Sequence, residues 1–571
     1  MGVPNYSSIK AILNTFSKRK DFFIPLLIPA IFIIGIIAKT PIRQVFDYYP
    51  DEGYALMGSS LFLKGFPLYN KIWLDQTPLL TVILSYWLKL FGASVYSGRI
   101  LILIFSGILL WAFYQIIKNQ WGRLCALIAV VFLIFSNAYA RLSVSVMIGI
   151  PALAFLMLSV YCLAIYRKNY SKYLLVLSGI FMALSLQTKL FTLFLLPFIA
   201  LEVIQTKGID LECNKKEGYA ISAFLLWFIG FLAAFLVITV IFFHFNFSMF
   251  VKMLFQSHIK GELALRNEFN FSVLRIMILR DYDTALLALT GIALIIREKK
   301  WRFIFPVLWL VSAFVMLLCH RPVFDHYYPL ISIPMCWLAA VSCREFFHGD
   351  MRKGWFTAKD QHNLTDVFFR WLTAGLIIAT ILPMPIKYYR TRLILRGEGP
   401  ASPQEQAVVN LLKKYKTYTP WVVTDRPIFA FYADMLVPPE FAIICHKRNF
   451  IDEEEQDYFI DTLQKYRVKL ILLYRLKHYG PKIISYIEKN YEKIYQDEVP
   501  KRESCWVSRK IKPEIHKTKP VNYNDIAKFI FYRWLRSSSP YFAREYDKRN
   551  IALYIDKEFL ENYSAPFAVK P

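Results

Sequence analysis

The segment "DFFIPLLIPAIFIIGIIAKT" (residues 21–40) is an apolar run long enough to cross a bilayer, and "FDYYPDEGYALM" (residues 46–57) follows it closely. Three acids, Asp47, Asp51 and Glu52, therefore stand among tyrosines where a membrane helix ends. Carboxylates beside lipid are costly unless water, a partner or a function holds them there. This pairing of a membrane helix with an acidic loop decides the class of fold and locates the first candidate site.

The composition of the whole chain is that of a polytopic membrane protein. Of the 571 residues, 56% are hydrophobic and only 19% are charged, and the charges cluster between long apolar runs. The net charge of +26 does not indicate a nucleic-acid partner, because basic loops facing an anionic leaflet account for much of it. Residues 1–20 are polar and basic, and the first run lacks a small-residue cleavage site, so we expect a retained helix.

Eleven apolar runs are candidate membrane crossings, each near the roughly 20 residues that a bilayer requires. Basic clusters fall on alternate loops, which by the positive-inside rule predicts a cytoplasmic N-terminus, an extracytoplasmic C-terminus and a multi-pass protein of the plasma (inner) membrane. The runs are 21–39, 98–117, 123–141, 146–166, 172–187, 189–205, 219–244, 283–297, 302–319, 327–346 and 369–388.

One apolar segment, residues 79–92, does not fit as a crossing, because counting it would invert every later loop. We interpret it as an interfacial helix within an outer loop, residues 40–97. The chain then divides into a transmembrane domain, residues 1–388, and a soluble outer domain, residues 389–571.

The outer domain is predicted to be a small α/β domain. Strands are expected within 421–433 and 468–475, and amphipathic helices within 452–467 and 481–495. A helical basic tail follows, typical either of a membrane-surface helix or of an exposed tail. Cys445 and Cys505 can form one disulfide if this region is exported and if the fold brings the two residues close together.

The order of motifs in this chain resembles the GT-C superfamily of integral-membrane glycosyltransferases, most closely the branch of protein O-mannosyltransferases and lipid A aminoarabinose transferases. The similarity runs over about the first 350 residues and, more weakly, around residues 422–439. The matching elements are Asp51-Glu52, Gly65 to Tyr69, Asp75 to Leu80, then Gly92, Ser94 and Arg99, Thr188-Lys189, and "HRPVFDHYYPLISIP" at 320–334.

The resemblance implies transfer of a sugar from a polyprenyl-phosphate carrier to an acceptor outside the cytoplasm. The sequence departs from the family in two places. No acid occurs in "RLSVSVMIGIPALAF", residues 141–155, and Asp75-Gln76-Thr77-Pro78 stands where aminoarabinose transferases have Glu-Lys before two prolines. The first departure leaves the role of a second acid absent or filled by Asp75, and the second weakens the case for that particular substrate.

Glycosyl transfer requires a base for the acceptor hydroxyl and positive charge for the departing phosphate. We assign the base to Asp51, place Glu52 and Asp75 in the catalytic group, and expect inversion, which needs only one such carboxylate. The phosphate is expected to meet Lys189, Arg321, His326 and Arg99, with Arg141 the weakest candidate, and the substrate pocket to be lined by Tyr54, Tyr69, Tyr327 and Tyr328.

Other interpretations stay open for several of these residues. Glu52 is also suited to capping a helix, Lys189 to reaching the interface, His326 to structural hydrogen bonding, and the pair at 327–328 to an aromatic belt. A divalent cation held by Asp51, Glu52, Asp75 and His326 is possible but is not expected to be obligatory.

The expected partners are a polyprenyl-phosphate-linked sugar, membrane lipids and an acceptor that is a glycan, a lipid or a protein, and no nucleic acid. Two competing functions remain, a transporter or flippase of lipid-linked material and a noncatalytic assembly factor. Transporters favour internal repeats and midplane charges. Here the charges gather at the outer rim.

Overall fold

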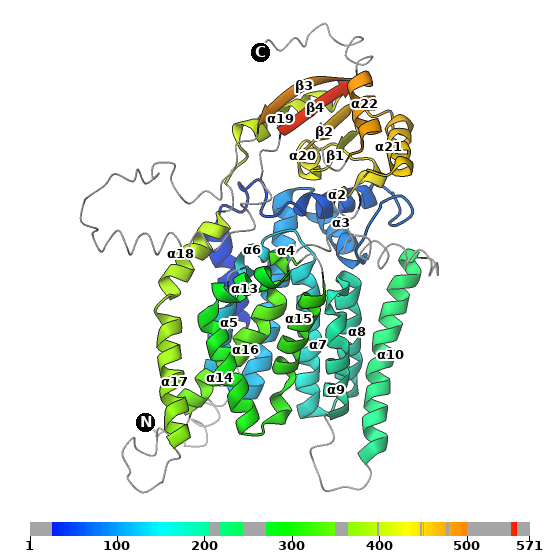
Figure 1. The fold of residues 1–571 in the computed structure, drawn as a ribbon. Coiled ribbons are helices and arrows are strands. Elements are labelled where there is room, and N and C mark those ends of the chain that lie inside the picture. Colours follow the sequence, from blue (N-terminus) through cyan, green and yellow to red (C-terminus); the bar gives the residue numbers. More distant parts are fainter. Residues whose placement is uncertain are drawn as a thin grey trace, which may run out of the picture.

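The computed structural model describes eleven stretches of the chain (Figure 1). Arg321, Cys505 and most of the basic tail lie outside these residues, so the predictions made for them stand as predictions. The described part of the tail, residues 550–556, is a strand and not the expected helix, because it pairs with distant strands of the sheet. The described stretches are 25–136, 138–205, 216–243, 270–320, 323–348, 364–396, 399–445, 448, 450–474, 479–498 and 550–556.

A bundle of apolar helices forms the larger part of the molecule (Figure 1). Among the described residues, four helical segments are long and apolar enough to cross a membrane, namely Val95–Trp121, Gly149–Asn169, Ile221–Phe242 and Trp371–Leu395. Shorter apolar helices accompany them, so each predicted run contains helix. The elements are Pro25–Lys39, α4 (Val95–Trp121), α5 (Arg123–Ile134), α6 (Tyr139–Leu142), α7 (Gly149–Asn169), α8 (Lys172–Thr188), η1 (Leu190–Leu195), α9 (Leu196–Gln205), α10 (Lys216–Phe243), α13 (Asn270–Arg280), α14 (Tyr282–Arg297), η3 (Trp301–Phe303), α15 (Phe305–Cys319), η4 (Asp325–Tyr327), α16 (Pro329–His348), α17 (Leu364–Ile381) and α18 (Met384–Leu395).

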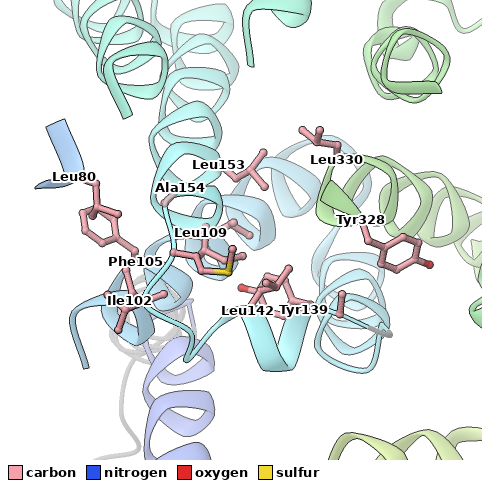
Figure 2. Packing of buried hydrophobic residues seen from close by; sticks show 14 of the residues in the cluster. Leu80, Ile102, Phe105, Leu109, Tyr139, Leu142, Leu153, Ala154, Tyr328 and Leu330 are labelled. Carbon is pink, nitrogen blue, oxygen red and sulfur yellow. The ribbon is translucent and has the colours of Figure 1, made fainter. Parts of the chain in front are cut away.

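Small residues let neighbouring helices approach closely, as helices in lipid commonly do. A Cβ built on Gly179 of α8 would lie 2.2 Å from the carbonyl oxygen of Trp227 on α10, and one built on Gly291 of α14 would lie 2.2 Å from that of Leu338 on α16. Glycine at these positions therefore fixes the α8–α10 and α14–α16 contacts. Elsewhere larger side chains fill the space between helices (Figure 2), among them Ile102, Phe105, Leu109, Leu142 and Leu153.

The two ends of the bundle differ in charge. The turns 118–123, 167–172 and 297–302 meet at one end, which we call the basic end: Lys168 donates to Asn119 at 3.1 Å, and the ring of Trp121 lies 4.4 Å from that of Phe303. Basic residues predicted to share one side of the membrane are thus together in space.

The opposite end carries α2 (Glu52–Leu63) and α3 (Leu79–Phe91), which lie between the bundle and the sheet (Figure 1). Hydrogen bonds join the two helices, since Ser59 donates to the carbonyl of Thr81 at 3.1 Å and Ser85 to that of Ser59 at 3.0 Å. The segment predicted at 79–92 therefore packs at the end of the bundle and does not cross it. We call residues 40–94, which join the first helix to α4, the acidic loop.

The C-terminal region is a four-stranded sheet with helices against it (Figure 1). The strand order is β1-β2-β4-β3, with β1 and β2 parallel and the other two pairs antiparallel. The helix α19 begins at a capping box formed by Ser402 and Glu405. The elements are α19 (Pro403–Tyr415), β1 (Val422–Thr424), α20 (Pro427–Tyr432), η5 (Pro439–Phe441), α21 (Glu453–Lys465), β2 (Leu470–Leu473), α22 (Pro481–Asn490), β3 (Tyr491–Glu498) and β4 (Asn550–Asp556).

Two of the predicted elements of this region need correction. Only residues 422–424 of the expected strand 421–433 are a strand, because Pro427 starts a helix there. The expected helix 481–495 ends at Asn490, where β3 begins and pairs with β4. The partner of β3 lies more than fifty residues further along the chain, so local periodicity did not indicate the pairing.

Candidate active site

Glu52 is fully buried at the start of α2 and forms an ion pair with Arg99 of α4, at 2.7 Å between Oε2 and Nη2. The same carboxylate accepts hydrogen bonds from the backbone N–H of Tyr48 at 2.8 Å and of Val146 at 2.9 Å. Glu52 therefore fastens the acidic loop both to α4 and to the segment that precedes α7.

Arg99 has every donor of its guanidinium occupied. Besides Glu52, it donates to the carbonyls of Ile42 at 2.8 Å, Val45 at 2.7 Å and Phe46 at 3.3 Å, and the side chain is fully buried. A guanidinium has five N–H groups, and all five point to protein acceptors here. The structure brings Arg99 and Glu52 together in the scaffold beneath the loop, where Arg99 has no donor left for a phosphate.

Asp51 has the opposite setting from its neighbour. It precedes the first turn of α2, its side chain makes no capping hydrogen bond to that helix, and it is half-buried, whereas Glu52 is fully buried. Of the two adjacent acids, Glu52 points into the scaffold, and Asp51 keeps part of its surface exposed.

Tyr49 connects the acidic loop to the turn before α16. Its hydroxyl lies 3.3 Å from Oδ1 of Asp325, to which it donates, and 3.0 Å from Nδ1 of His326. Asp325 also forms an ion pair with Arg141. Burial by itself would raise the pKa of Asp325, but the charges of Arg141 and Arg280 outweigh it and hold that pKa below the usual range.

Lys189 lies next to this turn. Its ammonium nitrogen is 4.7 Å from the ring centre of Tyr327 and 4.6 Å from that of Phe191, and the residue is 7% exposed. The ring of Tyr327 also lies 4.4 Å from that of His326, and its hydroxyl is 3.3 Å from Nε2 of His320. The break between α8 and η1 leaves Lys189 in extended backbone, which turns its side chain toward these rings.

Asp75 is held close to the same region. Gln76 donates to its Oδ2 at 3.2 Å, and Thr77 donates to the carbonyl of Leu186, three residues before Lys189, at 3.0 Å. Tyr69 has a φ of +67° and donates to the carbonyl of Gln76 at 2.8 Å, so the turn at Gly65 to Tyr69 sets the course of this segment.

The other two predicted pocket tyrosines, like Tyr69 and Tyr327, have protein partners for their hydroxyls. The hydroxyl of Tyr54 lies 2.6 Å from the carbonyl oxygen of Ile444 in the C-terminal domain. The hydroxyl of Tyr328 donates to Asp281 at 2.5 Å, and Asp281 belongs to a buried ionic cluster with Lys387 and Arg390. Tyr54 therefore fixes the loop to the C-terminal domain, and Tyr328 fixes the start of α16 to α14 and α18.

The sequence reasoning gave too little weight to Tyr49, Arg141, Arg280 and His320. Burial lowers the pKa of Arg280 to about 10, so it stays charged at neutral pH beside Asp325. One sequence signal could have found these four residues. All of them lie on loops or helix ends that the topology prediction assigns to the same side of the membrane as the acidic loop.

No group of three His, Cys, Asp or Glu side chains within the described stretches is placed to hold a metal ion. In the predicted set, the carboxylate of Glu52 is already occupied by Arg99 and two backbone N–H groups. The remaining acids, Asp51 and Asp75, belong to different segments of the loop.

Comparison with known proteins places this arrangement in one superfamily. Residues 75–242 match the family described as dolichyl-phosphate-mannose-protein mannosyltransferase. No curated protein matches the chain in sequence. Among solved structures, ArnT from Cupriavidus metallidurans in the apo state is similar with a TM-score of 0.54 at 12% identity, over 83% of this chain and 96% of that one.

Two further structures share the fold. ArnT from the same organism bound to undecaprenyl phosphate gives a TM-score of 0.53 at 12% identity, over 84% of this chain and 97% of that one. The oligosaccharyltransferase of Archaeoglobus fulgidus in the apo form gives 0.51 at 11% identity, over 95% of this chain and 89% of that one.

The chain thus resembles membrane-embedded helical glycosyltransferases of the GT-C type, in sequence over residues 75–242 and in fold over most of its length. Residues 75–242 are similar in sequence to the family of the protein mannosyltransferases, and the fold is similar to that of ArnT. The resemblance expected from the order of motifs in the acidic loop is confirmed.

Proposed function

We propose that the protein transfers a sugar, with inversion, from a polyprenyl-phosphate carrier to an acceptor on the side of the membrane that bears the C-terminal domain. The similar ArnT structure was solved with undecaprenyl phosphate bound, which supports this class of donor. The gathering of basic turns at the opposite end of the bundle supports a cytoplasmic N-terminus and an extracytoplasmic C-terminal domain in the plasma (inner) membrane.

The observation that carries the proposal is the setting of Asp51. This half-buried carboxylate stands two residues after Tyr49, and Tyr49 contacts His326, whose ring packs on Tyr327, which in turn contacts Lys189. We infer from this proximity in the chain that the carboxylate faces the cationic, aromatic cluster built from the acidic loop, the end of α8 and the turn before α16. The two charges that glycosyl transfer requires, a base and a cation, are supplied there by separate elements.

Lys189 is our choice for the group that stabilises the leaving phosphate. It is a buried cation whose ammonium is held between two ring faces, so it is oriented before any ligand binds. His326 and His320 flank it through Tyr327. Arg99, whose donors are all used, is assigned to the scaffold in this proposal.

A single displacement by an acceptor hydroxyl needs one base and inverts the anomeric carbon. Asp51 takes the acceptor proton, and Asp75, whose carboxylate is held by Gln76, contributes to substrate binding. We propose that the positive charge comes from lysine, histidine and arginine side chains and that a divalent cation is not obligatory.

Transfer of labelled sugar from a polyprenyl-phosphate donor to envelope acceptors by the purified protein tests this function. Asp51→Asn is expected to lower kcat by a factor on the order of 10²–10⁴, the usual contribution of a general base. The matched control is Asp434→Asn, an exposed acid of the C-terminal domain, which is expected to keep wild-type activity. Normal transfer by Asp51→Asn would overturn the assignment, and retention of the donor's anomeric configuration would overturn the single displacement.

A further inference from the structure

A turn of the C-terminal domain packs directly against the acidic loop. We call residues 424–427 the docking turn. Arg426 of this turn forms an ion pair with Asp47, and the two side chains are only 4% and 7% exposed. The partners are separated by 379 positions in the chain. A salt bridge buried this deeply across two domains fixes how they meet, because neither charge has water to replace its partner.

Further hydrogen bonds hold the same short segment of the loop. Tyr432 of α20 donates to the carbonyl of Phe46 at 2.9 Å, and the backbone N–H of Phe46 donates to the carbonyl of Gly399 at 3.0 Å. On the other side of Asp51, Tyr54 donates to the carbonyl of Ile444 at 2.6 Å. The C-terminal domain is therefore hydrogen-bonded to the loop on both sides of Asp51 in the chain.

Gly53 shows how closely the two domains approach. A Cβ at this position would lie 2.5 Å from the backbone nitrogen of Ile428, closer than real side chains come. The first turn of α2 thus rests against the first turn of α20, backbone to backbone. Even an alanine at position 53 would push the two helices apart.

The docking turn is itself firmly held. Asp425 accepts a hydrogen bond from the backbone N–H of Tyr474 at 3.0 Å, the backbone N–H of Arg426 donates to Thr424 Oγ1 at 3.0 Å, and the guanidinium of Arg426 lies 4.9 Å from the ring centre of Tyr474. These contacts hold the docking turn rigidly at the end of β2, so the turn limits the movement of the acidic loop that packs against it.

We propose that the docking turn is a positioning element for Asp51, with Asp47, Arg426 and Gly53 as its positioning residues. This inference rests on the proposed role of Asp51 as the base. The Glu52–Arg99 pair holds the loop from the side of the helix bundle. The C-terminal domain holds it at positions 46, 47, 53 and 54, and the docking turn itself contacts Asp47 through Arg426 and Tyr54 through the carbonyl of Asp425. A shift of about 1 Å at a reacting group lowers the reaction rate about 10²-fold. By holding Asp51 in place, the C-terminal domain therefore controls the rate of sugar transfer.

The decisive variant is the double substitution Asp47→Asn with Arg426→Gln. It removes the ion pair without leaving a buried charge unpaired, which either single change would do. We expect kcat to fall about tenfold or more, with the KM for the donor and the binding of undecaprenyl phosphate within about twofold of wild type. The matched control, Lys416→Gln with Asp434→Asn, removes an exposed ion pair of the same domain and should change neither.

A second readout does not depend on catalysis. Asp51→Cys is made in the wild-type, double-variant and control backgrounds, and the rate at which a maleimide modifies position 51 is followed by peptide mass spectrometry. A severalfold change in this rate in the double variant, with an unchanged melting temperature, supports positioning. An unchanged rate with wild-type kcat overturns it, as does a loss of kcat that tracks a lower melting temperature and weaker lipid binding. Absence of sugar transfer by the wild type would reject the proposed function alone, since the modification rate would still report on the position of residue 51.

Discussion

The Oε2 atom of Glu52 lies 2.7 Å from Nη2 of Arg99, and both side chains are fully buried. Asp51, the preceding residue, is half-buried. The two acids are adjacent in the sequence, but at the start of α2 they have different surroundings, one fully buried and one half-buried. Glu52 points into the scaffold, and Asp51 keeps part of its surface exposed.

Replacement of Glu52 by Gln is expected to destabilise the protein. The change leaves the Arg99 guanidinium buried without its counter-charge, and breaking a buried pair in this way costs about 3–5 kcal/mol. Thermal unfolding of the purified variant in detergent measures the loss. The matched control is Asp457→Asn, which removes an exposed ion pair with Lys482 and should stay within about 0.5 kcal/mol of wild type.

The companion double variant, Glu52→Gln with Arg99→Met, removes both charges and should recover part of the stability. An outcome in which Glu52→Gln melts like wild type but loses kcat would place Glu52 among the catalytic groups and contradict the scaffold role.

Replacement of Lys189 by Gln is expected to lower kcat by about 10²-fold, the usual effect of removing one preorganised group that stabilises developing charge. Lys189→Arg keeps the charge but changes the fit between the rings of Phe191 and Tyr327, so intermediate activity is expected. Steady-state transfer and binding of undecaprenyl phosphate are the measurements. Lys172→Gln, a change at the basic end, is the control, and equal activities of the two Gln variants would remove Lys189 from the site.

The acid sensitivity of the fold follows from Asp325. Its pKa in the folded protein lies below the usual value because Arg141 and Arg280 favour the charged form more than burial opposes it. A group with a depressed folded pKa contributes stability above its unfolded pKa, about 3.9 for Asp, and loses that contribution as the pH falls through the folded value. Asp325→Asn should therefore be less stable than wild type at neutral pH, with the gap narrowing below about pH 4.

Melting temperatures of the two proteins across pH measure this gap. The surface variant Asp434→Asn serves as control, since its partner Lys416 lies in solvent. A gap between wild type and Asp325→Asn that stayed constant down to the most acidic point would contradict the link between Asp325 and its arginines.

The sequence predicted the helical runs, the grouping of the basic turns at one end of the bundle and the family resemblance, because hydropathy and the positions of basic residues are local properties. It also brought Asp51, Asp75, Lys189 and His326 to one side of the membrane. It did not separate Glu52 from Asp51, since only the approach of Arg99, 47 residues later, makes Glu52 internal.

Long-range partners explain the remaining differences. Asp47 had no assigned role in the sequence, and its partner Arg426 lies 379 positions away. Tyr54 and Tyr328 were expected in the pocket, and their hydroxyls meet Ile444 and Asp281 from distant segments. Contacts of this kind depend on tertiary packing and leave no periodic signal in the chain.

Removal of divalent cations is expected to leave sugar transfer intact. The ammonium of Lys189 and the imidazoles of His320 and His326 gather around Tyr327, so positive charge is available at the proposed phosphate site from the protein itself. The measurement is transfer activity after dialysis against EDTA, with residual metal determined by mass spectrometry. The melting temperature of the same sample is the control, because it separates loss of chemistry from loss of fold.

Loss of activity at unchanged melting temperature, restored by Mg²⁺ or Mn²⁺, would contradict this expectation. Asp51 and Asp75 would then be the first candidates for ligands, since the carboxylate of Glu52 is already filled by Arg99 and two backbone N–H groups. In that case Asp75→Asn should raise the concentration of metal needed for half-maximal activity, whereas in a metal-independent enzyme it should change only the KM for substrate.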